Sequence, residues 1–204
     1  MNNSPSGLFC IPFPLSYNKG MTVFYTGKGD DGQSDLGDGK KVDKSCIEIE
    51  TLNVLDELNS LIGLVKTQPL PDFIKEMLNT IQEDLFIIQA HIGSLMFETK
   101  FPPPTFSPDK TKKLEEWSDY FEKKVQPARG FVIPGVTEPS AWLHWLRVVS
   151  RRTELSIVHL NKTTQGKISP AILAYHNRLS SVFYAMARYL VKEAGQEEKN
   201  PQYK

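Results

Sequence analysis

Apolar side chains recur every three or four residues along most of the chain, which places them on one face of an α-helix. In the stretch that begins at Ile47, for example, Leu52, Leu55 and Leu58 follow this spacing. The same spacing predicts helices over residues 47–67, 72–97, 107–125, 140–160 and 169–192. We therefore predict an all-α fold, a five-helix bundle.

Prolines and capping residues mark several of the predicted helix ends. Pro69 and Pro71 follow the first helix, which a proline cannot continue. Ser107-Pro108 and Ser169-Pro170 each offer a serine N-cap with proline in the first turn. The helix that begins near Ser107 has few apolar positions, so we expect it at the periphery of the bundle.

Two segments break the helical pattern. Val23–Tyr25 is a short extended run, and a polar, glycine-rich segment follows it over residues 27–39. Glycine allows positive φ angles and lets backbone N–H groups approach a ligand closely, but a surface loop with turns has the same composition. The pattern leaves both interpretations open. Phe131–Gly135 is the second such segment, a short strand or loop.

The composition changes at both ends of the chain. Residues 1–20 are rich in Asn, Ser, Pro and Gly, which predicts a flexible N-terminal extension. Residues 21–192 then form a single helical-bundle domain, of which the glycine-rich segment is the first part. Residues 193–204 form a polar C-terminal tail.

Composition excludes several classes of partner. The 204 residues include 24 Lys+Arg and 24 Asp+Glu, so no overall charge favours binding to nucleic acid or to an acidic membrane. No apolar run reaches the roughly 20 residues that span a bilayer. The only cysteines, Cys10 and Cys46, provide neither a disulfide framework nor a zinc-ligand spacing. We therefore expect a cytoplasmic protein with no nucleic-acid or membrane partner.

The helix over residues 140–160 carries the most informative polar residues. Arg147, Arg151 and Glu154 return to one helix face, while apolar residues cover nearly every other direction. A helix of that kind is usually buried, and a buried guanidinium group needs a carboxylate or phosphate partner. A structural ion-pair network and a phosphate site both satisfy this requirement.

Other chemistries find little support in the sequence. The four histidines show no metal-ligand spacing, no Gly-x-Ser-x-Gly elbow is present, and the glycine-rich segment is not a Walker A sequence. The residues themselves therefore indicate a ligand that bears phosphate, but they do not identify that ligand or a reaction. The histidines are His91, His144, His159 and His176.

Several motifs, taken together and in order, resemble those of the PduO-type ATP:cob(I)alamin adenosyltransferases. The N-terminal motifs are Tyr25–Gly32, Leu36–Gly39 and Val54–Gly63. The C-terminal motifs are Phe131–Gly135, His144-x-x-Arg147-x-x-x-Arg151-Arg152-x-Glu154, Asn177–Ser180 and Ala187–Tyr189. The resemblance covers roughly residues 22–191.

This resemblance implies a five-helix bundle of the ferritin-like, cobalamin adenosyltransferase-like type, assembled as a homotrimer with active sites between subunits. It also implies that Co(I) of a reduced corrinoid attacks the C5′ carbon of ATP, which gives adenosylcobalamin and triphosphate. ATP and cobalamin would be substrates, with Mg²⁺ as cofactor. A flavoprotein reductase and an adenosylcobalamin-dependent enzyme are the further partners that it implies.

The resemblance also implies roles for individual residues. Around the nucleotide phosphates it places Thr26, Gly27, Lys28 and Gly29, with Lys44 as a further contact. It completes the ATP site from the other side of the interface with Arg151, Glu154 and Asn177. Asp56 and Arg147 would form an intersubunit ion pair. The expected catalytic residues are Arg147, Arg151 and Asp56. Phe131 would lie on the lower corrin face and help to exclude the axial base.

The sequence departs from the family pattern at two positions near the expected corrinoid and arginine sites. Val136 replaces the second glycine after Pro-Gly, and Ser181 replaces an aspartate after Arg-Leu-Ser. The departures favour an alternative function, a divergent non-catalytic trimer that binds ATP or corrinoid for storage, delivery or regulation. The family's other residues at Lys28, Arg147 and Arg151 favour the enzyme.

Overall fold

The computed structural model describes residues 29–35, 40–96, 102–125 and 130–203. Within these residues the chain forms five helices and one two-stranded antiparallel sheet, so the predicted all-α bundle is confirmed. The elements are β1 (Gln33–Asp35), β2 (Lys41–Asp43), α1 (Ile47–Val65), α2 (Asp72–Gly93), α3 (Asp109–Lys124), α4 (Glu138–Thr163) and α5 (Pro170–Glu193). The expected strand Val23–Tyr25 lies outside the described residues.

The small sheet is a difference from the sequence prediction. β1 and β2 lie in and just after the segment that we predicted to be a glycine-rich loop, and Gln33 pairs with Asp43. Gly32 has φ +78°, and its carbonyl accepts a hydrogen bond from the Lys44 amide at 2.9 Å. These strands of three residues have no apolar alternation for a sequence pattern to detect.

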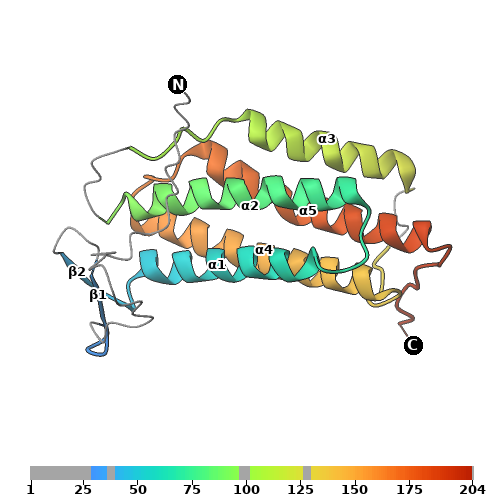
Figure 1. Cartoon of the computed structure of the whole chain (residues 1–204), viewed down its shortest axis with the longest axis horizontal. Helices are drawn as coiled ribbons and strands as arrows, with labels where there is room; N and C mark the ends of the chain where they lie inside the picture. Colours follow the sequence, from blue (N-terminus) through green and yellow to red (C-terminus); the bar gives the residue numbers. More distant parts are fainter. Residues whose placement is uncertain (1–28, 36–39, 97–101, 126–129, 204) are drawn as a thin grey trace, which may run out of the picture.

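The helices pack side by side in two layers, with α3 outermost (Figure 1). α4 packs against both α1 and α5, while α3 packs on α5 and α2 packs on α1. The predicted peripheral position of the third helix is therefore confirmed. Within the described part of the chain, no helix is long and apolar enough to cross a membrane.

Side-chain contacts show that α1 and α4 run in opposite directions. Thr51 and Ser156 share a hydrogen bond of 2.9 Å, and one turn further along α1 the Thr153 hydroxyl donates to the Val54 carbonyl at 3.5 Å. Residues that advance along α1 therefore meet residues that retreat along α4. The start of α1 lies beside the end of α4, and the β1–β2 hairpin lies at that end of the bundle (Figure 1).

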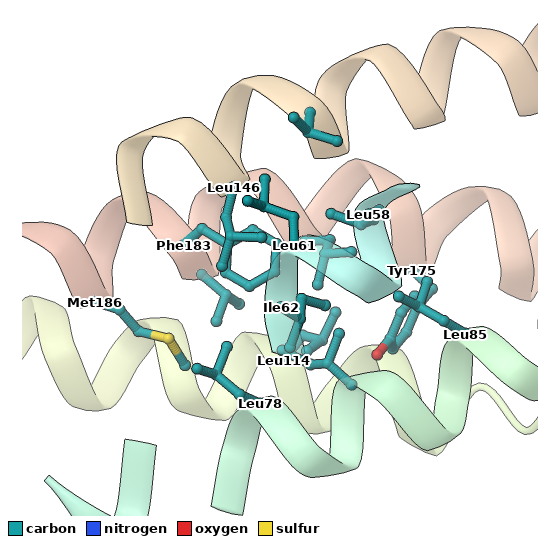
Figure 2. Close-up of a cluster of buried hydrophobic side chains, with 14 of the residues drawn as sticks. Leu58, Leu61, Ile62, Leu78, Leu85, Leu114, Leu146, Tyr175, Phe183 and Met186 are labelled. Atoms are coloured by element: carbon teal, nitrogen blue, oxygen red, sulfur yellow. The ribbon is translucent and has the colours of Figure 1, made fainter. Parts of the chain in front are cut away.

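Apolar side chains from all five helices fill the interior (Figure 2). Tyr175, Phe121 and Phe183 are the largest fully buried side chains. Burying a side chain of this size stabilises a fold by roughly 1.5–3 kcal/mol. The core therefore accounts for the helical periodicity of the sequence.

The apolar surface of α4 does not follow the prediction. We expected this helix to be buried almost all round, but Trp145, Val148 and Leu155 are 52%, 52% and 70% exposed. They lie on the side of α4 that faces away from its neighbours α1 and α5. The expectation was wrong for the single chain because only one stripe of a helix can face a bundle core.

Asp84 joins three helices from a position 3% exposed. Its carboxylate accepts a hydrogen bond from the Tyr175 hydroxyl at 3.0 Å and forms an ion pair with Lys110. α2, α5 and α3 thereby meet at one buried carboxylate. Removing one partner from such a pair usually costs several kcal/mol, because a buried charge then remains uncompensated.

Of the two predicted helix caps, one is confirmed. The Ser169 hydroxyl accepts from the Ile172 amide and caps α5, as predicted. Thr137 and Ser140 form a capping box at α4, which begins earlier than we expected. At α3, Pro108 rather than Ser107 is the N-cap residue.

His176 is fully buried on α5, and neither ring nitrogen has a hydrogen-bond partner among the described residues. Burial lowers its pKa to about 3, since the apolar surroundings disfavour the charged imidazolium. Because the pKa is depressed in the folded state, His176 binds its proton mainly after unfolding. The associated stability is complete above about pH 6.5 and is lost as the pH falls towards 3.

We predict that His176→Leu removes this pH dependence. Below about pH 6, the free energy of unfolding should fall more steeply with decreasing pH in the wild type than in the variant. The difference between the two slopes should be up to about 1.4 kcal/mol per pH unit. Urea titrations of both proteins at pH 8 and pH 5 measure the difference. An equal gap between the two proteins at both pH values would contradict the prediction.

Candidate functional site

The glycine-rich end of the site is only partly described. Thr26, Gly27 and Lys28 lie outside the described residues, so their expected contact with phosphates stays a prediction. Gly29 and Lys44 are brought together: the Lys44 ammonium group donates to the Gly29 carbonyl at 2.7 Å. A Cβ atom on Gly29 would lie 2.6 Å from the Lys44 nitrogen, so the two residues are in close contact.

The hairpin positions this lysine from a short, polar scaffold. The Asp31 carboxylate accepts from the Gln33 amide and pairs with Lys41 at 3.0 Å, and both interactions lower the pKa of Asp31. The Lys44 side chain is exposed. An exposed ammonium group beside a glycine turn can bind an anion.

Glu154 of α4 and Asn177 of α5 are in contact across the α4–α5 interface. Their expected role at an ATP site stays a prediction. The Asn177 side-chain amide donates to a Glu154 carboxylate oxygen at 2.8 Å. Arg178 extends this contact, because it donates to the Asn177 carbonyl oxygen at 2.5 Å and to Glu115 of α3 at 2.9 Å. A line of polar side chains therefore crosses α4, α5 and α3 on the surface of the bundle.

Arg147 is half-buried in the first half of α4. Its Nε atom is buried and has no hydrogen-bond partner among the described residues. His144, one turn earlier, has a lowered pKa because of its burial and the nearby charge of Arg147. The neutral histidine adds no charge beside the guanidinium group. Arg147 can therefore accept an anionic partner from outside the described chain.

Asp56 lies in a groove between α1 and α2 with a volume of about 510 Å³. Asn59 and Gly63 line the same groove, so these three residues lie on one face of α1. No ion pair links Asp56 to Arg147 among the described residues. The expected pair was an intersubunit one, so it stays a prediction.

Arg151 and Arg152 have different surroundings although they are neighbours. Arg152 forms an ion pair with Glu57 of α1, whereas the exposed Arg151 forms no ion pair with any residue that the structure describes. The polar stripe predicted for α4 therefore contains one half-buried arginine and one exposed arginine. We had expected both to be buried, and for Arg151 the expectation was wrong.

Phe131 lies at the other end of the bundle, in the segment that leads into α4. Its side chain is 78% exposed. Beside this segment is a pocket of about 300 Å³, to which Gly130, Ser181, Tyr184 and Arg188 contribute. Ser181, one of the two departures from the family pattern, therefore lies beside the segment that carries Phe131.

The two ends of the candidate site are far apart within one chain. α1 has 19 residues, and at 1.5 Å per residue it is about 28 Å long. Lys44 precedes α1, whereas Phe131 precedes α4, which runs in the opposite direction beside α1. One chain therefore does not bring the glycine-rich hairpin and Phe131 to a common position.

Sequence reasoning missed the role of the C-terminal residues 194–203. We predicted a polar tail, but Glu198 pairs with Arg188 at 2.8 Å, and Asn200 donates to the Phe131 carbonyl at 2.8 Å. Gly195, with φ +65°, follows the last helix and reverses the chain. A glycine directly after a helical pattern is a known sign of such a turn and was the available signal.

Comparison with known proteins agrees with this geometry. Residues 24–190 match the family model described as cobalamin adenosyltransferase. A cobalamin adenosyltransferase from Cupriavidus metallidurans is 33% identical over 176 residues, which are 86% of this chain and 91% of the relative. The corrinoid adenosyltransferase PduO from Salmonella typhimurium is 31% identical over 169 residues, but this chain spans only about half of its length (49%).

A solved structure is also similar. It is a variant of a PduO-type ATP:corrinoid adenosyltransferase from Lactobacillus reuteri, complexed with cobalamin and ATP. The TM-score is 0.78 and the identity 28%, and the match covers 86% of this chain and 95% of that one. The fold and the motifs together define the class of protein: a helical-bundle enzyme that acts on a nucleotide. The chain belongs to the PduO-type cobalamin adenosyltransferase family.

We predict that Asn177→Ala leaves the fold largely intact. Asn177 is exposed, and its hydrogen bond to the partly exposed Glu154 should contribute about 1 kcal/mol or less to the free energy of unfolding. Chemical denaturation of the variant measures this contribution. Asn161→Ala, which removes the side-chain oxygen that accepts from the Ile168 amide at 3.0 Å, provides a comparison. A loss of several kcal/mol for Asn177→Ala would show that the pair is mainly structural.

Proposed function

We propose that this chain transfers the 5′-deoxyadenosyl group of ATP to Co(I) of a reduced corrinoid. The electron pair of Co(I) forms the Co–C5′ bond, the C5′–O bond breaks, and triphosphate leaves with that bonding pair. Cobalt becomes Co(III), so the electrons balance without an added oxidant. The observation that carries the proposal is the family match over the whole bundle together with Arg147, Arg151, Glu154 and Asn177 on adjoining helices.

The residues suit this reaction because the corrinoid metal is itself the nucleophile. The protein then has to orient C5′ towards cobalt and stabilise the negative charge of the leaving triphosphate. Lys44 and Arg151 are exposed cations that can bind phosphate oxygens. Glu154 and Asn177 hold each other in place and can orient the nucleoside.

Mg²⁺ would enter with the nucleotide. Mg²⁺ usually keeps several water ligands and binds through substrate phosphates and one or two carboxylates. It therefore needs no dedicated cluster of protein ligands. Its chemistry here would be to neutralise part of the triphosphate charge.

We propose a homotrimer with sites between subunits. The separation of the hairpin from Phe131 supports this assembly, because a neighbouring subunit can supply what one chain keeps apart. Exposed apolar side chains supply a surface to bury: Leu64, Phe86, Trp145, Val148 and Leu155 are each between 46% and 70% exposed. In that assembly Asp56 of one subunit would be the partner of Arg147 in the next.

The reaction sets requirements for other proteins. Co(I) is strongly reducing, so a reductase has to supply it, and an adenosylcobalamin-dependent enzyme has to receive the product. We propose the cytoplasm as the site of the reaction, since the sequence has only two cysteines and they form no disulfide framework.

The test is to reduce cobalamin chemically, add ATP, Mg²⁺ and the protein, and follow the corrinoid spectrum. We expect a light-sensitive product with a Co–C bond. Binding of corrinoid or ATP without product would instead support a storage or delivery protein, the alternative that Val136 and Ser181 favour.

We predict that Arg147→Ala lowers the rate of product formation by about 100-fold or more. In the proposed trimer it would leave Asp56 without its charged partner, and such a loss costs several kcal/mol. Circular dichroism should show an unchanged helix content. Lys162→Ala, which removes an exposed charge from the last turn of α4, is the matched control and should keep the wild-type rate. A wild-type rate for Arg147→Ala would remove Arg147 from the mechanism.

A further inference from the structure

The C-terminal segment, residues 194–203, is fastened across one end of the bundle (Figure 1). α5 ends in a Schellman motif: the Gln196 amide donates to the Val191 carbonyl at 3.1 Å, and the Gly195 amide donates to Lys192 at 2.9 Å. Gly195 takes the left-handed conformation that the motif needs. The chain therefore turns back towards the start of α4 instead of extending into solvent.

The returning segment forms hydrogen bonds with the residues around Phe131. The Ile133 amide donates to the Lys199 carbonyl at 2.8 Å, and the Asn200 side-chain amide donates to the Phe131 carbonyl at 2.8 Å. Asn200 also lies against Gly130, where a Cβ atom would be 3.6 Å from its side-chain nitrogen. The C-terminal segment thus contacts the backbone on both sides of Phe131.

A second contact fastens the segment to α5. The carboxylate of Glu198 accepts from Arg188 at 2.8 Å, and their side chains are only 14% and 12% exposed. Arg188 lies over the Tyr184 ring, and His144 of α4 packs against the same ring at 5.9 Å. Such a shielded pair is stronger than an ion pair on the surface.

Phe131 itself contributes little to its own placement. Its side chain is 78% exposed, so packing against the bundle cannot hold it. The hydrogen bonds of the adjacent backbone therefore decide where the ring lies.

We propose that Glu198 and Asn200 are positioning residues for the corrinoid. They hold the Phe131 segment so that its exposed ring meets the lower corrin face. The identity of the ligand, a corrinoid, rests on the proposed function. The contact between the C-terminal segment and the Phe131 segment does not depend on it. Glu198 anchors the C-terminal segment to α5, and Asn200 transfers that anchor to the Phe131 carbonyl.

The first measurement tests the contact without any ligand. Amide hydrogen exchange of Ile133 should accelerate at least fivefold in Glu198→Gln, which removes the ionic part of the anchor, and in Asn200→Ala, which removes its link to Phe131. Lys199→Ala is the matched control on the same segment. It keeps the backbone carbonyl that accepts from Ile133, so the exchange rate should stay at the wild-type value.

The second measurement tests the consequence for the reaction. In both variants we expect the KM for the corrinoid to rise about fivefold, as the loss of one hydrogen bond allows, while the KM for ATP is unchanged. Electron paramagnetic resonance measures the fraction of bound Co(II) corrinoid that has lost its axial base. This fraction should fall in both variants as well. A merely structural role would not separate the two substrates.

The outcomes distinguish the positioning role of Glu198 and Asn200 from the proposed function of the protein. Faster Ile133 exchange with an unchanged corrinoid KM and an unchanged Co(II) spectrum would overturn the positioning role. Unchanged exchange in both variants would overturn the contact itself. A wild-type protein that forms no adenosylated corrinoid would contradict the proposed function, while the exchange data would still report on the contact.

Discussion

The antiparallel packing of α1 against α4 determines how far apart Lys44 and Phe131 lie within one chain. Thr51 meets Ser156 and Val54 meets Thr153, so the two helices cannot slide or reverse without losing these contacts. The hairpin with Lys44 is fixed at the start of α1, and the Phe131 segment is fixed at the start of α4. The length of one helix, about 28 Å, separates them. A transfer reaction requires its two reacting atoms in contact, which is why the proposed site needs a second subunit.

The surface of α4 fits the same requirement. Its inner stripe completes the core, while Trp145, Val148 and Leu155 face outwards beside Arg151. An exposed apolar stripe is costly in water, and covering it with a second copy of the chain would remove that cost. The half-buried guanidinium group of Arg147 would gain a carboxylate partner in the same step. Assembly and site formation would thus be one event in the proposed trimer.

Sequence patterns predicted the parts of this protein that depend on periodic burial. The five helices and the Ser169 cap follow from local spacing and capping chemistry. The hairpin and the role of Asn200 depend on contacts between residues distant in sequence, which periodicity does not encode. Asp84 lies on the apolar stripe of α2, but only the fold shows that Lys110 and Tyr175 are its partners. The exposure of Arg151 and Trp145 was mispredicted because one helix sequence serves two surfaces, the core and the outer face of α4.

Mixing two inactive variants tests the site between subunits most directly. Lys44→Ala removes a contact from the hairpin side, and Arg151→Ala removes one from the helix side. If each site takes its hairpin from one subunit and its helices from the next, equal coexpression should restore about a quarter of wild-type activity, since a quarter of random interfaces combine two intact halves. Each variant alone should remain inactive. Coexpressed variants that show only the sum of their separate activities would contradict the account.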